Sequence, residues 1–163
     1  MNWTWLFFSF EGRINRAKWW LALLVFVVLA LLISFAILPL LGLSVMTMGA
    51  TAGGAAVSLI ITLIFAYPGT AVLVKRIKDR DRPLWLVAVF WAPTVLSILG
   101  QLAGVTASVQ EIGGQQVLMP TAFGWVVNLL SFVVGIWALI ELGCLRGTKG
   151  PNQHGPDPLG ASA

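Results

Sequence analysis

Apolar residues occur in long blocks along this chain, separated by short charged stretches. Residues 19–74 contain no Lys, Arg, Asp or Glu. One membrane-spanning helix needs about 20 apolar residues, so this block is long enough for two helices joined by a turn. The Gly-rich stretch 44–56 is suited to the turn, which predicts membrane helices at about 19–43 and about 57–74.

The second half of the chain repeats this pattern. A charged stretch at 75–83 precedes an apolar run at about 84–103, then a polar loop and a further apolar run at about 122–145. A Gly-Gly pair lies near the centre of the loop, and two adjacent glycines favour a tight hairpin turn. The sequence therefore predicts an all-α membrane protein with four transmembrane helices, and it favours a short hairpin at 105–119.

The basic residues indicate the orientation of these helices. All ten Lys and Arg lie in residues 1–18, in 75–83 or in the tail 146–163, whereas 44–56 and 104–120 contain none. Because cytoplasmic loops carry the excess of Lys and Arg, both termini and the middle loop are expected in the cytoplasm. The loops 44–56 and 104–120, and with them the hairpin, are then expected on the opposite side of the membrane.

Residues 13–52 also allow a different interpretation, a cleaved signal peptide. They contain basic residues, an apolar run and a small-residue stretch at 50–52 that resembles a cleavage site. The apolar core of a signal peptide is about 7–15 residues long. The apolar run here continues from about 19 to 43, which favours a retained span.

The composition narrows the class of protein. Only 10% of the residues are charged, whereas a soluble domain would have about one quarter. The single Cys144 and the single His154 exclude an internal disulfide and a multi-histidine metal site. No serine, histidine and aspartate set or pair of catalytic carboxylates is evident. We therefore expect one membrane domain over 1–163 that has no metal or cofactor and is not an enzyme.

Three polar stretches lie on the predicted cytoplasmic side: "FEGRINRAKWW" (10–20), "KRIKDRDRPLW" (75–85) and "GTKGPNQHGPDP" (147–158). Asn15 in the first can cap a helix by accepting hydrogen bonds from first-turn amides. Basic residues and tryptophans at this position also act as plain interface anchors. The closely spaced prolines and glycines of the third stretch favour an ordered cap under the helices, with a frayed C-terminus as the alternative.

The mixed charge on one side predicts that the three stretches meet. Asp79 and Asp81 are expected to orient Arg13 and Arg16, because two acids among many basic residues near one surface should find partners. The candidate cluster consists of Arg13, Arg16, Arg76, Asp79, Asp81, Arg82, Asn152 and Asp157. Glu141 is the only acid inside a predicted span, and we expect it to pair with a basic residue or to reach the interface.

These motifs resemble those of the DUF805 family of small bacterial inner-membrane proteins. The Gly-Arg-x-x-Arg motif and its aromatic pair are matched by Gly12, Arg13, Arg16, Trp19 and Trp20. The motif after the second span is matched by Arg76, Asp79 and Arg82, with Lys78 in the place of the usual histidine. The tail motif is matched by Gly150, Pro151, Asn152, Gly155, Asp157 and Pro158. The resemblance covers nearly the whole chain and implies no biochemical activity. It implies a multi-pass protein of the bacterial inner membrane, which would place the hairpin at 105–119 in the periplasm.

The function expected from these features is a non-enzymatic interaction or lipid association. A basic cytoplasmic face suits anionic lipid headgroups, whose surface potential attracts Lys and Arg. Nucleic acid is not expected, because the basic residues lie at membrane level and no base-reading element follows them. The alternative is a small homo-oligomeric transporter or channel, since Pro68 and Pro93 interrupt two of the spans. A protein partner or a second copy remains open.

Overall fold

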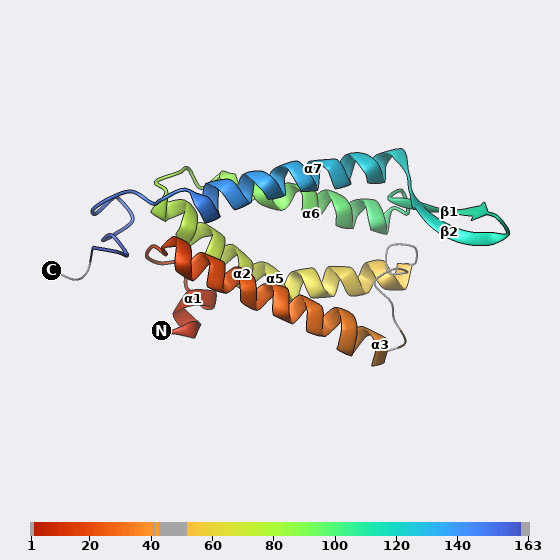
Figure 1. Ribbon diagram of the computed structural model, residues 1–163, viewed down its shortest axis with the longest axis horizontal. Coiled ribbons are helices and arrows are strands. Elements are labelled where there is room, and N and C mark those ends of the chain that lie inside the picture. The colour runs from red at the N-terminus through yellow and green to blue at the C-terminus, as the bar shows by residue number, and fades with distance from the viewer. Residues whose placement is uncertain (1, 41, 43–51, 161–163) are drawn as a thin grey trace. The chain divides into compact units, whose positions relative to one another are not determined.

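The computed structural model describes residues 2–40, 42 and 52–160, and most of them are helical (Figure 1). The first half contains α1 (Trp3–Phe8), α2 (Arg16–Leu32), the π-helical segment η1 (Ile33–Ile37), α3 (Leu38–Leu40) and α5 (Ala52–Asp79). The second half contains α6 (Leu86–Leu102), β1 (Ala107–Ile112), β2 (Gln115–Pro120), α7 (Ala122–Ala138) and the π-helical segment η2 (Leu139–Cys144).

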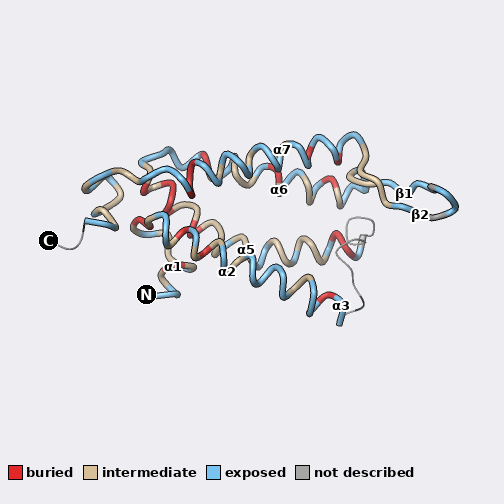
Figure 2. The backbone as a smooth tube through the Cα atoms, viewed as in Figure 1, coloured by how far each residue is buried: buried red, intermediate tan, exposed pale blue. Residues whose placement is uncertain are grey.

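Three helical stretches of the described chain are long and apolar enough to cross a membrane, namely Arg16–Leu40, Gly53–Asp79 and Ala122–Cys144. The apolar helix α6 is shorter, with 17 residues. Only 11% of the most apolar window in each long stretch is buried inside the protein. Many large apolar residues of these helices are therefore exposed, as expected of helices surrounded by lipid. Figure 2 colours the backbone of exposed residues pale blue.

The second long helix, α5, extends beyond its predicted bounds of 57–74 at both ends. It begins at Ala52, inside the predicted 44–56 loop, and it continues through Lys75 to Asp79. The predicted loop at 75–83 is thus partly helical, because Lys75 and Arg76 are buried against backbone carbonyls and do not end the helix. The predicted turn residues 44–51 and the signal-cleavage stretch at 50–52 lie largely outside the described residues.

Local hydrogen bonds fix the ends of the helices. Asn15 caps α2 as predicted, since its Oδ1 accepts a 3.0 Å hydrogen bond from the Lys18 N–H. At the end of α5 the N–H of Arg82 donates to the Ile77 carbonyl and the N–H of Asp81 to the Lys78 carbonyl, each at 3.1 Å. This is a Schellman motif, and Asp81 is its left-handed residue, with φ of 53°.

The hairpin predicted at 105–119 is formed by β1 and β2, which pair antiparallel from Ala107 opposite Pro120 to Ile112 opposite Gln115. Gly113 and Gly114 make the two-residue turn with φ of 61° and 79°. Positive φ at both central residues is the type I′ arrangement that the Gly-Gly pair favours.

The chain forms two compact units. Unit 1 comprises Met1–Val27, Ile64–Phe90 and Gly135–Ala163, and unit 2 comprises Val28–Leu63 and Trp91–Val134. The main buried cluster belongs to unit 1 and consists of Leu6, Ile14, Trp19, Ala22, Val72, Ile77, Leu86 and Leu142. It packs parts of α1, α2, α5, α6 and η2 together, and so it positions the polar residues at the end of α5.

Candidate functional site

Arg13 is the centre of a buried polar network in unit 1. It lies between α1 and α2, and all three of its guanidinium nitrogens are engaged. Nε and Nη2 bind Asp79 Oδ1 at 3.2 and 3.1 Å. Nη1 donates to the carbonyls of Gly150 and Gly155 at 3.0 and 3.1 Å, and Nη2 donates to the carbonyl and hydroxyl of Thr148 at 2.8 and 2.9 Å. Arg13 therefore joins α5 to the tail.

Arg76 occupies the other side of the same carboxylate. Its Nη1 binds Asp79 Oδ2, its Nε donates to the Leu142 carbonyl and its Nη2 to the Leu145 carbonyl, the last two at 2.6 Å. These carbonyls lie at the end of η2, where the helix leaves carbonyls without partners of its own. Asp79 is thus held between two guanidiniums, and its backbone carbonyl accepts a 2.9 Å hydrogen bond from the Thr148 N–H. We call Arg13, Arg76 and Asp79 the buried ion group.

A second group of charges surrounds Glu141. Its Oε1 accepts from Arg80 Nε and Nη2 at 3.2 and 3.1 Å, and from Arg82 Nε at 2.9 Å. The expectation that Glu141 pairs with a basic residue is confirmed. Arg82, which was predicted to join the first cluster, belongs here instead, because it follows the turn that ends α5. We call Arg80, Arg82 and Glu141 the outer ion group.

The prediction that Asp81 orients an arginine of the first motif is wrong. Its Oδ1 accepts a 3.0 Å hydrogen bond from Gln153 Nε2. Asp81 is the left-handed residue beyond the end of α5, so it has left the helix face that carries Asp79.

The tail, residues 146–160, folds back onto this region. Asn152 Nδ2 donates to the Lys78 carbonyl at 3.0 Å. Asp157 accepts the N–H of Gly150 at 3.0 Å through Oδ2 and the N–H of Leu159 at 2.9 Å through Oδ1. These N–H groups, with Leu159 the larger effect, hold the pKa of Asp157 below its usual range. The tail is therefore an ordered cap, and Asn152 and Asp157 fix it on α5 and on itself.

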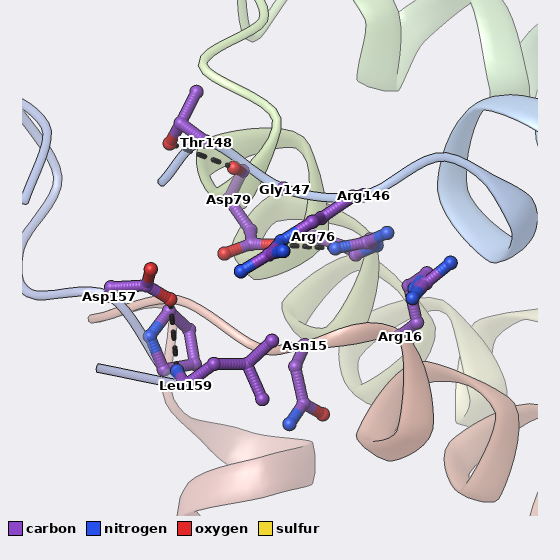
Figure 3. Close-up of a pocket in the computed structure, with 10 residues that line it drawn as sticks. Asn15, Arg16, Arg76, Asp79, Arg146, Gly147, Thr148, Asp157 and Leu159 are labelled. Atoms are coloured by element: carbon purple, nitrogen blue, oxygen red, sulfur yellow. Dashed lines mark hydrogen bonds and ion pairs between the residues drawn. The ribbon is translucent and has the colours of Figure 1, made fainter. Parts of the chain in front are cut away.

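Arg16 lines one pocket with Arg76 and Asp79 of the buried ion group, but the hydrogen bond of its side chain goes to a backbone carbonyl. Arg16 is exposed, and its Nη1 donates to the Cys144 carbonyl at 2.9 Å. The pocket is shallow and has an empty volume of about 240 Å³, including the space open to solvent (Figure 3). The residues that line this pocket are Asn15, Arg16, Arg76, Asp79, Arg146, Gly147, Thr148, Asp157, Pro158 and Leu159.

Sequence reasoning missed two lysines of this region. Lys75 is fully buried, and its Nζ donates to the carbonyls of Trp5 and Leu6 at 2.5 and 2.6 Å and lies 4.5 Å from the centre of the Trp5 ring. Lys78 Nζ donates to the Phe10 carbonyl at 2.8 Å. Both lysines fix the segment before α2 on α5. Every residue has a backbone carbonyl, so no pattern of residue types in the sequence indicated these partners.

The buried part of the site is saturated with hydrogen bonds. Over residues 2–40, 42 and 52–160, no buried side-chain nitrogen or oxygen lacks a partner. In the same part of the chain no three His, Cys, Asp or Glu residues gather as metal ligands. The buried ion group can therefore hold the tail, α5 and the N-terminal segment together. The hydrogen-bond donors that remain available for a ligand are those of exposed side chains.

Comparison with known proteins identifies the family of the chain. The model of a family described as a protein of unknown function, DUF805, matches residues 7–156. The chain belongs to the DUF805 family. The three stretches that resemble DUF805 motifs lie together in unit 1, where the first supplies Arg13, the second Asp79 and the third the carbonyls of Gly150 and Gly155.

Two relatives of the chain are proteins of Escherichia coli. The chain is 30% identical over 158 residues to the uncharacterized protein YiiR of Escherichia coli strain K12, which covers 94% of this chain and 87% of YiiR. The same values hold for YiiR of Escherichia coli O157:H7. No solved structure matches the chain.

Proposed function

We propose that this DUF805 protein is a four-span inner-membrane protein, with both termini in the cytoplasm, that associates with anionic lipid headgroups and does not catalyse a reaction. The observation that carries the proposal is the distribution of charge. All ten Lys and Arg and five of the six acids belong to unit 1, whereas unit 2 has Glu111 alone. Such a one-sided basic surface suits the anionic cytoplasmic leaflet.

The length of α6 supports a fourth span. Its 17 residues correspond to roughly 25 Å, near the lower limit for crossing a hydrocarbon core of about 30 Å. The preceding residues 83–85 add a helical turn, since the N–H groups of Leu86, Val87 and Ala88 bond to the carbonyls three residues earlier. Four spans would place both termini on one side, as the positive-inside rule requires.

The hydrogen bonds indicate which basic residues can contact lipid. Arg13, Arg76 and Lys75 are buried, and Arg80 and Arg82 bind Glu141. Lys78 donates to the Phe10 carbonyl. Among the described residues, the four remaining basic side chains form no salt bridge, namely Arg16, Lys18, Arg146 and Lys149. A basic residue near an anionic leaflet contributes about 1 kcal/mol of binding free energy, so these four give a clear preference for anionic lipid.

Lipid analysis tests the association. The protein is extracted with its surrounding lipid into polymer discs, and the lipids are quantified by mass spectrometry. We expect enrichment of anionic over zwitterionic lipid relative to the bulk membrane, and loss of that enrichment when Arg16, Lys18, Arg146 and Lys149 are changed to Gln. A matched control changes four uncharged polar residues of the hairpin. The same lipid composition in the discs and in the bulk membrane would contradict the proposal.

The orientation is tested by cysteine labelling. Cys144 is the only cysteine, so a Cys144→Ser chain accepts single new cysteines. A membrane-impermeant maleimide should label Gln110→Cys in intact spheroplasts and Lys149→Cys only after permeabilisation. The reverse order would show the opposite orientation, and labelling of both in intact spheroplasts would show that the stretch Ala122–Cys144 between them does not cross the membrane.

The transporter or channel alternative predicts a different result. Ion or solute flux through vesicles reconstituted with the purified chain, at a rate that scales with the square or a higher power of protein density, would favour a homo-oligomeric pore over lipid association.

A further inference from the structure

The pocket beside α2 combines side chains from segments that are far apart in the sequence. Asn15 and Arg16 come from the start of α2, Arg76 from the end of α5, and Arg146 from the beginning of the tail (Figure 3). Three guanidiniums thus line one opening. The pocket also lies at the ends of membrane-length helices, since Arg16 begins one such stretch and Cys144, two residues before Arg146, ends another.

Two of these guanidiniums have donors to spare. Arg13 and Arg76 direct all their nitrogens to protein oxygens. Arg16, in contrast, uses a single N–H for the Cys144 carbonyl. In the described part of the chain the Arg146 side chain makes no hydrogen bond, although its backbone carbonyl accepts one from Arg80. An arginine has five N–H donors, so both side chains can bind a ligand without breaking the fold.

The carboxylates in the pocket wall do not cancel this positive charge. Asp79 is neutralised by two guanidiniums, one on each oxygen. Asp157 presents oxygens that already accept the N–H groups of Gly150 and Leu159. Arg16, Arg76 and Arg146 line the pocket together with the two carboxylates, and Arg13 binds one of these carboxylates. The guanidiniums outnumber the carboxylates, so the pocket keeps a net positive charge and free donors.

We propose that Arg16 and Arg146 bind one phosphate group at the mouth of this pocket. A guanidinium fork matches the oxygens of a phosphate in a bidentate geometry that a lysine ammonium cannot reproduce. The phosphate is that of a lipid headgroup or of a small soluble phosphate compound. The inference rests on the proposed membrane association and narrows it from a diffuse basic surface to one site.

Thermal unfolding of the detergent-purified full chain tests the site. The first probe is phosphatidylglycerol added to neutral micelles, and the second is inorganic phosphate exchanged for chloride at constant ionic strength. We expect an increase in melting temperature that saturates with the probe. Changing Arg146 to Gln should weaken the apparent affinity about tenfold, because a hydrogen bond between two charged groups is lost.

Lys149 provides the matched control. It is an exposed basic residue three positions further along the tail and does not line the pocket. Lys149→Gln removes the same charge as Arg146→Gln, so a difference between them reports the site and not the net charge. Arg146→Lys keeps the charge but loses the fork, and it should fall between wild type and Arg146→Gln. The melting temperature without probe shows that each variant folds.

The two probes separate the sources of the phosphate. Saturable stabilisation by both indicates that the group itself is recognised, and stabilisation by one alone identifies the lipid or the soluble form. Each of these results supports the site if Arg146→Gln weakens the apparent affinity for the probe more than Lys149→Gln does. Equal weakening by both variants would overturn the site while leaving the diffuse lipid association standing. Absence of stabilisation by either probe would also overturn the site, whereas a disc lipid composition equal to the bulk would refute the proposed function itself.

Discussion

The buried and the outer ion groups use the same chemistry in different surroundings. In the buried ion group the side chains of Arg13, Asp79 and Arg76 are 1%, 4% and 0% exposed. In the outer ion group Glu141 is 9% exposed, Arg80 17% and Arg82 51%. Both place one carboxylate between two arginines, and they differ most in how far water reaches the arginines.

Burial changes what each group contributes. Removing one partner of a buried ion pair leaves an uncompensated charge in a poorly solvated place and costs about 3–5 kcal/mol, whereas an exposed pair is worth roughly 0.2–1 kcal/mol. We therefore interpret the buried ion group as the structural centre of unit 1 and the outer ion group as a minor contribution at its surface.

The largest effect is expected from neutralising the two carboxylates separately. Asp79→Asn leaves two buried guanidiniums without a counter-charge and should lower the free energy of unfolding by about 3–5 kcal/mol. Glu141→Gln leaves two arginines that water can reach and should cost roughly 1 kcal/mol or less. Equilibrium unfolding of the two variants in the same micelles measures the difference. Equal losses would show that burial does not distinguish the groups.

A smaller effect is expected from adding one methyl group beside the buried carboxylate. A Cβ at Gly147 would come within 2.5 Å of Asp79 Cγ and 2.8 Å of Oδ1. Gly147→Ala must push the tail or the carboxylate aside, which should cost about 1–3 kcal/mol. Gly135→Ala in α7 is the control, because a Cβ there meets nothing within 4 Å. If both variants unfold at the same temperature, the tail does not pack on Asp79 as described.

The turn that separates the two groups offers a change of opposite sign. Asp81 holds a left-handed conformation that costs an L-residue roughly 1 kcal/mol and costs glycine almost nothing. Asp81→Gly should raise the melting temperature slightly. The gain from the relaxed backbone is reduced by the loss of the exposed hydrogen bond from Gln153. Gln153→Ala measures that loss alone. A melting temperature lower than that of Gln153→Ala would contradict this account of the turn.

The smallest effect concerns pH. The pKa of Asp157 is lowered in the folded protein, mainly by the N–H groups of Leu159 and Gly150. Its contribution to stability is therefore present above the unfolded pKa of 3.8 and is lost as the pH falls through the lower folded pKa. Melting temperatures measured between pH 6 and pH 3 (about the range of carboxyl titration) should fall less steeply for Asp157→Asn than for wild type. Parallel curves would show that Asp157 does not stabilise the tail.

Features set by neighbouring residues could be predicted from the sequence. The Asn15 cap, the Gly113-Gly114 turn and the apolar stretches each depend on interactions within a few positions of the chain. The partner of Glu141 was predicted by type, because an acid near the end of an apolar helix needs a basic residue. Each of these signals is carried by residue type alone.

Features set by backbone carbonyls could not be predicted. Arg76 and Lys75 were expected at the end of a span because they are charged, yet carbonyls of α1 and η2 receive them inside unit 1. Thr148 and Gly147 contact the buried ion group only because of the path that the tail takes past Asp79. No local sequence pattern encodes this path. The separation of Asp81 from the arginines follows from a single left-handed residue whose conformation is unusual for aspartate.

The bonds from Arg13 to Thr148, Gly150 and Gly155 also set an order of events during synthesis. Arg13 is translated before α2, α5, α6 and α7, and these partners are translated after them. Its side chain therefore lacks these ligands while the helices between them are made. The network closes only after residues 148–155 have left the ribosome.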